Sequence, residues 1–202
     1  MSSTVDARLP LSLLEAVRIV DTPEGDDIEA EYIEELRRKR LGLSDTVYAQ
    51  IKRYSAAVLR NERTVRDEAA ALARLISRRT DAHRVFESAG SMLAHEAVET
   101  VSVLRRSAIQ RLPGMLARPL ALAVLRQIAR RYLDARVERI GSHVILAVSD
   151  PVTVDDSPIA GFAFYAQAFA TMLEEVTGRP AVVVRIDGAA PGQRWQASWG
   201  RA

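Results

Sequence analysis

The stretch from Ser157 to Asp187, SPIAGFAFYAQAFATMLEEVTGRPAVVVRID, decides the fold. No charged residue occurs in it before Glu174, and its apolar side chains recur at helical spacing. Ser157 and Pro158 are typical of the start of a helix, and Gly178 is typical of the end of one. The β-branched run that follows Pro180 predicts a strand. We therefore expect a buried helix, followed by a strand, at the centre of the protein.

Short alternating segments extend this unit on both sides. Residues 135–140 and 143–148 flank Gly141-Ser142, a pattern that is typical of a β-hairpin. Residues 194–199 alternate again and predict a last strand. The second half of the chain therefore runs as helices, a hairpin, a long helix and a second hairpin. This order predicts an α+β fold in which helices cover an antiparallel sheet.

Residues 1–79 predict a helical extension in front of this domain, which spans residues 80–202. Residues 1–9 are expected to be a mobile lead, and Asn61 is a candidate cap for the last helix of the extension. The helices between Leu9 and Leu59 have apolar faces. We expect these faces either to pack over the following domain or to form a homodimer, and we predict the homodimer.

Two helices of the second half carry a specific expectation each. Gly90 lies inside a helix that begins at Asp81, where glycine costs ~1 kcal/mol relative to alanine. Its expected compensation is the close approach of another backbone. Pro119 is expected to start the next long helix, which is apolar nearly all round at its beginning and should therefore be central.

Composition limits the classes of function. Hydrophobic residues make up 48% and charged residues 27% of the 202 residues, as in a globular protein, and the net charge is only +2. The arginines are spread along helices, which argues against a nucleic-acid partner. The chain has no cysteine, which suits the reducing cytoplasm, and it lacks the pattern of a signal peptide. The uncharged run of residues 157–173 is shorter than the ~20 residues of a membrane span.

Candidate catalytic and metal sites are few. His95 and Glu99 stand at i,i+4, a spacing that can hold a metal but that is also that of an ordinary helix-surface pair. His143 begins a strand and could ligate a haem or another tetrapyrrole. The sequence has no nucleophile elbow, no phosphate-binding loop and no dinucleotide fingerprint. We therefore expect neither a metal site nor enzymatic activity.

Aromatic residues are rare in the chain (5%), yet most of them fall on the helix 158–176 and on the last strand. They indicate either a packed core or the wall of an apolar pocket for a ring or a hydrocarbon chain. The residues expected to line such a pocket are Phe162, Tyr165, Phe169, Met172, Leu122, Leu125, Trp195 and Trp199.

Residues 80–200 carry local motifs of one known family. These motifs are Ala89-Gly90, the strand His143 to Val148 with its Ser149-Asp150-Pro151 exit, Ile159 to Phe162, Thr177 to Pro180, and Gly192 before the closing strand. In these motifs and in its order of elements, the chain resembles the 4-vinyl-reductase domain family, whose superfamily includes ligand-binding domains of nitric oxide signalling and Golgi transport. The cysteines that family members often carry near the last two strands are absent here.

The resemblance implies a non-catalytic binding or sensory domain for a hydrophobic small molecule. A tetrapyrrole is one such ligand, because the family takes its name from a proposed role in bacteriochlorophyll synthesis. The alternative is a protein–protein interaction or assembly module without a small ligand. A reductase in its own right is the third alternative, and it would need a bound electron source, for which the sequence has no dinucleotide or flavin fingerprint.

Overall fold

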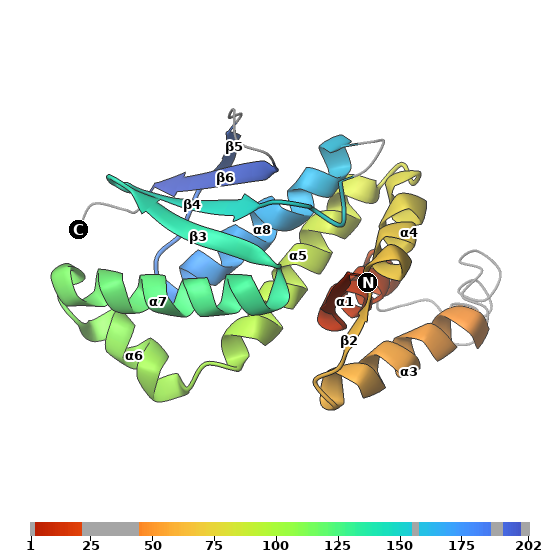
Figure 1. The fold of residues 1–202 in the computed structure, drawn as a ribbon, viewed down its shortest axis with the longest axis horizontal. Coiled ribbons are helices and arrows are strands. Elements are labelled where there is room, and N and C mark those ends of the chain that lie inside the picture. Colours follow the sequence, from red (N-terminus) through yellow and green to blue (C-terminus); the bar gives the residue numbers. More distant parts are fainter. Residues whose placement is uncertain (1–2, 22–44, 155–157, 187–191, 199–202) are drawn as a thin grey trace, which may run out of the picture.

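The computed structural model describes residues 3–21, 45–154, 158–186 and 192–198. Within them it has seven helices and two antiparallel sheets, of two and four strands, which confirms the predicted α+β class (Figure 1). The elements are β1 (Thr4–Asp6), α1 (Arg8–Val20), α3 (Asp45–Leu59), β2 (Arg63–Val65), α4 (Arg66–Ser77), α5 (Ala82–Glu99), α6 (Val103–Arg111), α7 (Gly114–Tyr132), β3 (Ala135–Ile140), β4 (His143–Val148), α8 (Pro158–Thr177), β5 (Val183–Ile186) and β6 (Gln193–Ser198).

Helix α8 is the centre of the fold, as its sequence predicts. It packs against β5 and β6 on one side and against α5 along its length on the other, while α1 packs against α5. A Cβ atom on Gly90 of α5 would lie 2.2 Å from the carbonyl oxygen of Phe164 in α8. This distance confirms the close backbone approach that Gly90 predicts, and it explains why no larger residue fits there.

The four-stranded sheet has the order β3-β4-β6-β5, with every neighbouring pair antiparallel. The hairpin between β3 and β4 turns at Gly141, whose φ of 60° lies in the left-handed region. Val137, Leu146 and Trp195 are buried. Leu146 of β4 lies opposite Val137 of β3 on one side and opposite Trp195 of β6 on the other. These side chains form the face that the helices cover.

The beginning of the chain differs from its prediction. Residues 4–6 form β1 rather than a mobile lead, because they pair with β2 in an antiparallel ladder. Asn61 does not cap a helix. It adopts a positive φ of 54° just before β2, and α4 begins only at Arg66. Both expectations, the mobile lead and the Asn61 cap, are wrong because β1 and β2 pair although they are far apart in the sequence.

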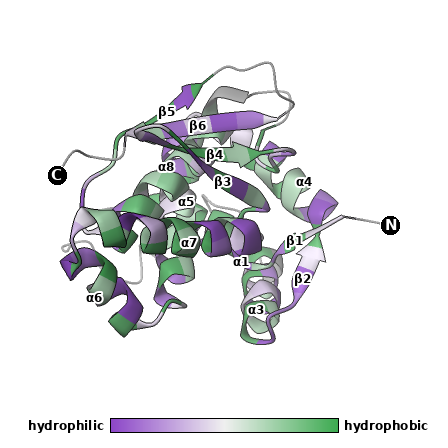
Figure 2. Ribbon diagram, turned by 60° about the vertical axis from the view of Figure 1, so that its left-hand side comes forward, coloured by the Kyte–Doolittle hydropathy of each residue, from purple (hydrophilic) through white to green (hydrophobic). Residues whose placement is uncertain are grey.

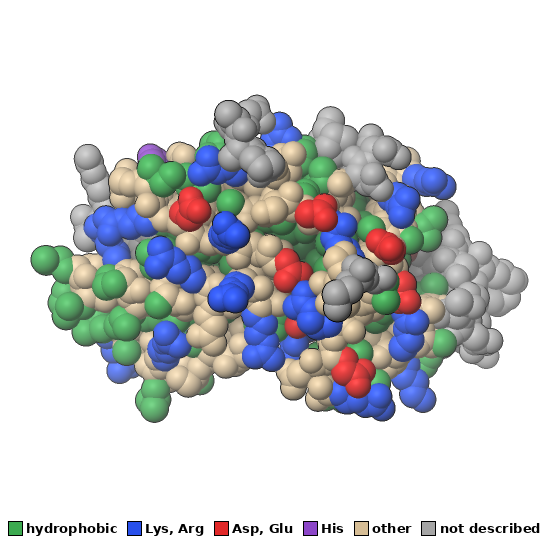
Figure 3. Space-filling model, in the orientation of Figure 1, with side chains coloured by type: hydrophobic (Ala, Val, Ile, Leu, Met, Phe, Trp, Pro, Cys, Tyr) green, Lys and Arg blue, Asp and Glu red, His purple; other side chains and the backbone are tan. Residues whose placement is uncertain are grey.

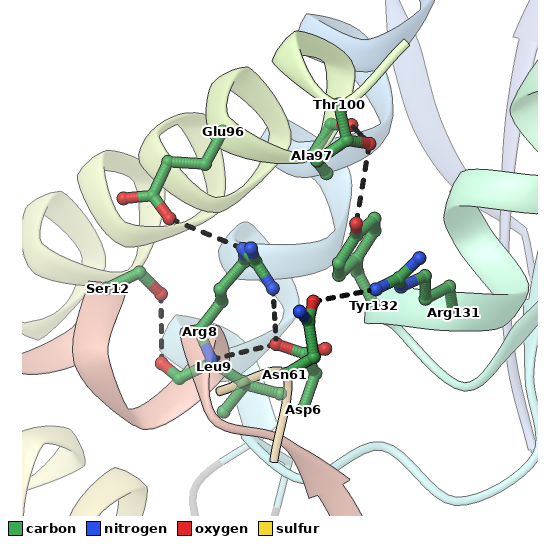
Figure 4. Close-up of polar contacts among 10 residues, drawn as sticks. All are labelled: Asp6, Arg8, Leu9, Ser12, Asn61, Glu96, Ala97, Thr100, Arg131 and Tyr132. Atoms are coloured by element: carbon green, nitrogen blue, oxygen red, sulfur yellow. Dashed lines mark hydrogen bonds and ion pairs between the residues drawn. The ribbon is translucent and has the colours of Figure 1, made fainter. Parts of the chain in front are cut away.

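A polar cluster joins this beginning to α5 and α7 (Figure 4). Arg8 lies 3.4 Å from Asp6 and 3.7 Å from Glu96, and its guanidinium lies over the ring of Tyr132. The hydroxyl of Tyr132 in turn donates to Thr100. The side chains of Arg8 and Asp6 are almost completely buried, so these contacts orient β1 and α1 against the rest of the molecule.

One hydrophobic core runs from the N-terminal helices into the sheet. Leu9 and Leu13 of α1 belong to the same cluster of buried residues as Phe86 of α5 and Trp195 of β6. The apolar face of α1 is therefore covered within the chain. A smaller cluster of Leu11, Leu14 and Tyr54 holds α3 onto α1.

Helix α7 corrects two expectations. It begins at Gly114, after Pro113, so Pro119 lies inside the helix rather than at its start. The backbone bonds of α7 begin at Leu116 and Ala117, so Pro119 lies beyond the first turn and removes the bond to the carbonyl of Met115, four residues earlier. The beginning of α7 is also not central, because Met115, Leu116 and Leu120 are exposed, and only its later turns are buried against β3 and α8.

Candidate docking surface

The residues predicted to line a pocket come together, but as closely packed side chains. Tyr165, Phe169 and Met172 of α8, Leu125 of α7 and Trp195 of β6 have no exposed surface. Phe162 and Leu122 are half-buried and pack against the same core. Trp199 lies outside the described residues.

Their rings contact one another. The ring of Trp195 lies 5.1 Å from that of Tyr165 and 6.3 Å from that of Phe162, measured between centroids. The guanidinium of Arg185 lies 4.2 Å from the centroid of the Phe162 ring. None of the three surface hollows described below is lined by these aromatic residues.

Two polar atoms of this cluster differ in their surroundings. The hydroxyl of Tyr165 accepts a hydrogen bond of 2.9 Å from the backbone N–H of Val152, and burial raises the pKa of Tyr165. The indole Nε1 of Trp195 is buried and has no acceptor among the described residues. A buried donor without an acceptor costs ~1–3 kcal/mol, so an acceptor brought by a ligand would be favourable there.

The surface of α6 and of the first turns of α7 exposes large apolar side chains. Five large apolar side chains on α6 and the first turns of α7 face outward: Val103, Leu104, Met115, Leu116 and Leu120. Leu104 is 83% and Met115 90% exposed. Figure 3 shows hydrophobic side chains gathered at this end of the molecule, and Figure 2 shows hydrophobic turns of α6 and α7 next to hydrophilic ones. We call these five residues the apolar tip. Met115, Leu116 and Leu120 lie at the beginning of α7, whereas Val103 and Leu104 begin α6, whose Arg105 donates a hydrogen bond to Gln127 of α7. Clustered exposure of this kind is typical of an interaction site.

The same helices are strongly basic. Between Glu99 and Asp134 the sequence has seven arginines and no acidic residue. Arg126 and Arg130 of α7, Arg136 of β3 and Arg63 of β2 line an open groove with a volume of about 870 Å³, in which Asp134 and Glu138 are the acidic residues. We call it the arginine groove. Arg63 pairs with Asp134 at 2.8 Å, whereas Arg130 and Arg136 have no ion-pair partner in the described part of the chain.

The apolar tip and the arginine groove share one face of α7. The exposed residues of this helix recur every three or four positions: Met115, Leu116, Pro119, Leu120, Ala123, Arg126, Gln127, Arg130 and Arg131. From Met115 to Arg130 this face extends roughly 22 Å at ~1.5 Å per residue. Its first half is apolar and its second half is basic.

Two smaller hollows lie elsewhere. One lies between α6, α7 and the end of α8 and has a volume of about 50 Å³, and Gln110 and Arg118 are among the residues that line it. The other lies between α3 and α4, where Tyr54, Leu72 and Leu75 contribute to its largely apolar wall, and has a volume of about 380 Å³. Neither contains a cluster of catalytic groups.

His95 has a second carboxylate partner that its sequence position does not reveal. Its Nδ1 lies 2.7 Å from Glu175 of α8, and its Nε2 lies 3.4 Å from Glu99 of its own helix. The hydrogen bond to Glu175 and the negative charges raise the pKa of His95 above its ordinary value. Among the described residues, no group of three or more His, Cys, Asp or Glu side chains is placed to hold a metal ion. We therefore interpret His95 as a contact between α5 and α8.

Spacing along the sequence does not reveal this candidate surface. It places the arginines on separate helices, whereas α7, β2 and β3 bring four of them to one groove. A signal was nevertheless available. The absence of any acidic residue between Glu99 and Asp134 is unusual in a chain whose charges nearly balance overall.

Among the helices that the structure describes, none combines the length and the hydropathy that crossing a bilayer requires. Comparison of the chain with protein-family models, with curated proteins and with solved structures gives no match. The resemblance to the 4-vinyl-reductase domain family therefore stays a prediction, and functional inference rests on the chemistry of the surfaces described above.

Proposed function

We propose that this protein is a non-catalytic interaction module that docks onto a partner through the apolar tip and the arginine groove. The observation that carries the proposal is the exposure of five large apolar side chains, three at the beginning of α7 and two at the beginning of α6. Each of them contributes a favourable free energy when a partner removes it from water. The arginines beside them would set the orientation and favour a partner of negative charge.

Photo-crosslinking tests this proposal without assuming what the partner is. A photoreactive amino acid replaces Met115 in the full chain, expressed in its own cells, and a matched chain carries it at Leu59. Leu59 is similarly exposed, at 84%, but lies on α3, away from the apolar tip. We expect adducts from position 115 in clear excess over those from position 59. Equal yields at the two positions would contradict the proposal.

A carrier or sensor of a hydrophobic small molecule, such as a tetrapyrrole, is the second candidate function. The observation that favours it is the Nε1 atom of Trp195, which is buried among aromatic rings without an acceptor in the described residues. Native mass spectrometry of the purified protein tests it. A mass in excess of that of the chain, lost on denaturation, would support a bound ligand, and the bare mass alone would contradict one.

We also retain the homodimer as a proposal, with α3 rather than α1 as the contact. Leu9 and Leu13 of α1 are buried within the chain, whereas Tyr48, in the first turn of α3, is exposed. The proposed contact is centred on Tyr48 and leaves Leu59, at the other end of α3, outside it. Sedimentation of the full chain at micromolar concentration tests it, and a monomeric mass would exclude it.

The cytoplasm stays the proposed location, on the lack of cysteine alone.

A further inference from the structure

We propose that the partner of the docking surface is the surface of an anionic lipid bilayer, on which α7 lies with its apolar tip inserted and its arginines at the headgroups. This inference rests on the proposed function and names the class of partner.

Charge argues against a symmetric dimer of the chain through this face. Two copies that met through this face would bring arginines against arginines, because no acidic residue lies between Glu99 and Asp134. Like charges that lose water at an interface oppose association. The acidic residues of the arginine groove do not reverse this, since Asp134 is paired with Arg63 and only Glu138 remains beside Arg126, Arg130 and Arg136. The occupant is therefore anionic.

The way in which the apolar side chains are exposed favours a bilayer over a folded acidic protein. Leu104 and Met115 line none of the three described hollows, and Figure 3 shows the hydrophobic side chains of this end at the edge of the molecule. Side chains that are 83% and 90% exposed have little contact with their own neighbours. Protruding side chains need a complementary pocket in a protein, but they enter the headgroup region of a bilayer without one.

The apolar and basic residues of α7 follow one another along one face, whereas a helix that lies flat at a membrane has them on opposite faces. This order suits a tilted helix that enters the bilayer surface with its beginning. The exposed face begins with Met115, Leu116 and Leu120 and continues one to three turns later with Arg126 and Arg130. Long arginine side chains can keep their guanidinium groups among the phosphates while the apolar residues sit deeper. Each cation near an anionic surface strengthens binding about fivefold, which corresponds to ~1 kcal/mol. Neither α6 nor α7 is suited to cross the bilayer, so the binding is peripheral.

Vesicle flotation of the full chain tests the inference. The probes are phosphatidylcholine vesicles with and without phosphatidylglycerol, at about 0.1 M and about 1 M salt, where charges are screened over ~10 Å and ~3 Å. We expect binding to the anionic vesicles at low salt and much weaker binding to phosphatidylcholine alone. Absence of binding to the anionic vesicles at low salt would overturn the inference.

Two pairs of variants separate insertion from simple attraction. The double variant Leu104→Gln and Met115→Gln should weaken vesicle binding about tenfold or more, because both side chains lose apolar burial. The double variant Arg126→Gln and Arg130→Gln should weaken it about fivefold for each arginine. The matched controls Leu59→Gln and Arg60→Gln make the same changes on exposed residues at the end of α3 and beyond, and should bind as the parent does. Unchanged binding of the Leu104 and Met115 variant would overturn the inference, since it would reveal attraction by charge alone.

Insertion has a direct optical readout, because the chain has no cysteine. The substitutions Met115→Cys and Leu59→Cys each create a single labelling position for a polarity-sensitive fluorophore. On anionic vesicles we expect a blue shift at position 115 and none at position 59. If instead position 115 yields protein adducts in the crosslinking experiment while the vesicles are not bound, the proposed function stands and the lipid partner is wrong. Failure of both experiments rejects both.

Discussion

Helices α8 and α7 are both long and rich in apolar residues, yet the molecule uses them in opposite ways. α8 packs between α5 and the four-stranded sheet, so Phe164, Phe169 and Met172 have no exposed surface. α7 rests on β3 with one face and leaves its other face uncovered, with Met115 at its exposed beginning. The number of neighbours that a helix has, rather than its apolar content, determines whether its side chains build a core or a surface.

The largest expected difference between the two helices is in the cost of truncating an apolar side chain. Phe169→Ala removes a completely buried ring and should lower the free energy of unfolding by ~3–5 kcal/mol. Met115→Ala removes a side chain that is almost completely exposed and should change it by less than ~0.5 kcal/mol. Urea denaturation of both variants measures the two effects. Similar losses in both would show that α7 is covered in solution.

The next effect concerns the backbone contact between α5 and α8. Gly90→Ala places a Cβ atom 2.2 Å from the carbonyl oxygen of Phe164, so the two helices must move apart. We expect a loss of ~1–3 kcal/mol, as for other overpacked cores, in spite of the better helix propensity of alanine. The control is Gly114→Ala at the start of α7, where a Cβ atom meets nothing within 4 Å. That variant should be neutral or slightly more stable. A stable Gly90→Ala protein would show that the close contact is absent.

A third substitution decides whether the aromatic cluster is a core or a pocket. Ala166 of α8 is half-buried, and Ala166→Phe adds a large ring beside the predicted ligand residues. In a closely packed core we expect a loss of ~1–3 kcal/mol through overpacking. In a pocket the folding free energy would hardly change, and a hydrophobic ligand bound by the parent would be lost. Thermal melting and ligand binding, measured on this variant and its parent, distinguish the two.

The smallest effect is a pH dependence that belongs to α8 and not to α7. The folded pKa of His95 lies above its ordinary value of 6.5, because Glu175 accepts its hydrogen bond. The stabilisation is therefore fully present below pH 6.5 and is lost as the pH rises through the folded pKa. Denaturation curves between about pH 5 and about pH 9, which bracket the ordinary histidine pKa of roughly 6.5, should show this decline in stability. His95→Gln should remove the decline. A parent whose stability rises over that range would contradict the contact.

Local signals in the sequence predict several elements correctly. Pro158 at the start of α8, Gly178 just after its end and the β-branched run beyond Pro180 act through backbone chemistry within a few residues, and the structure has α8, β5 and the paired strands where these signals place them. Gly90 belongs to the same group. A glycine inside a helix has a cost that only a close neighbour can offset, so the contact could be inferred before the neighbour was known.

Which apolar faces are covered and which charges meet depends on how distant segments pack together. β1 and β2 are each three residues long and exist because they pair with one another across about sixty positions, which no local signal encodes. Arg63 is far in sequence from Arg126 and Arg136, and the three line one groove because β2, α7 and β3 converge. Met115 is exposed and Phe169 is buried for the same reason. Burial depends on what the rest of the chain brings to each face, and that is a property of the whole fold rather than of any one segment.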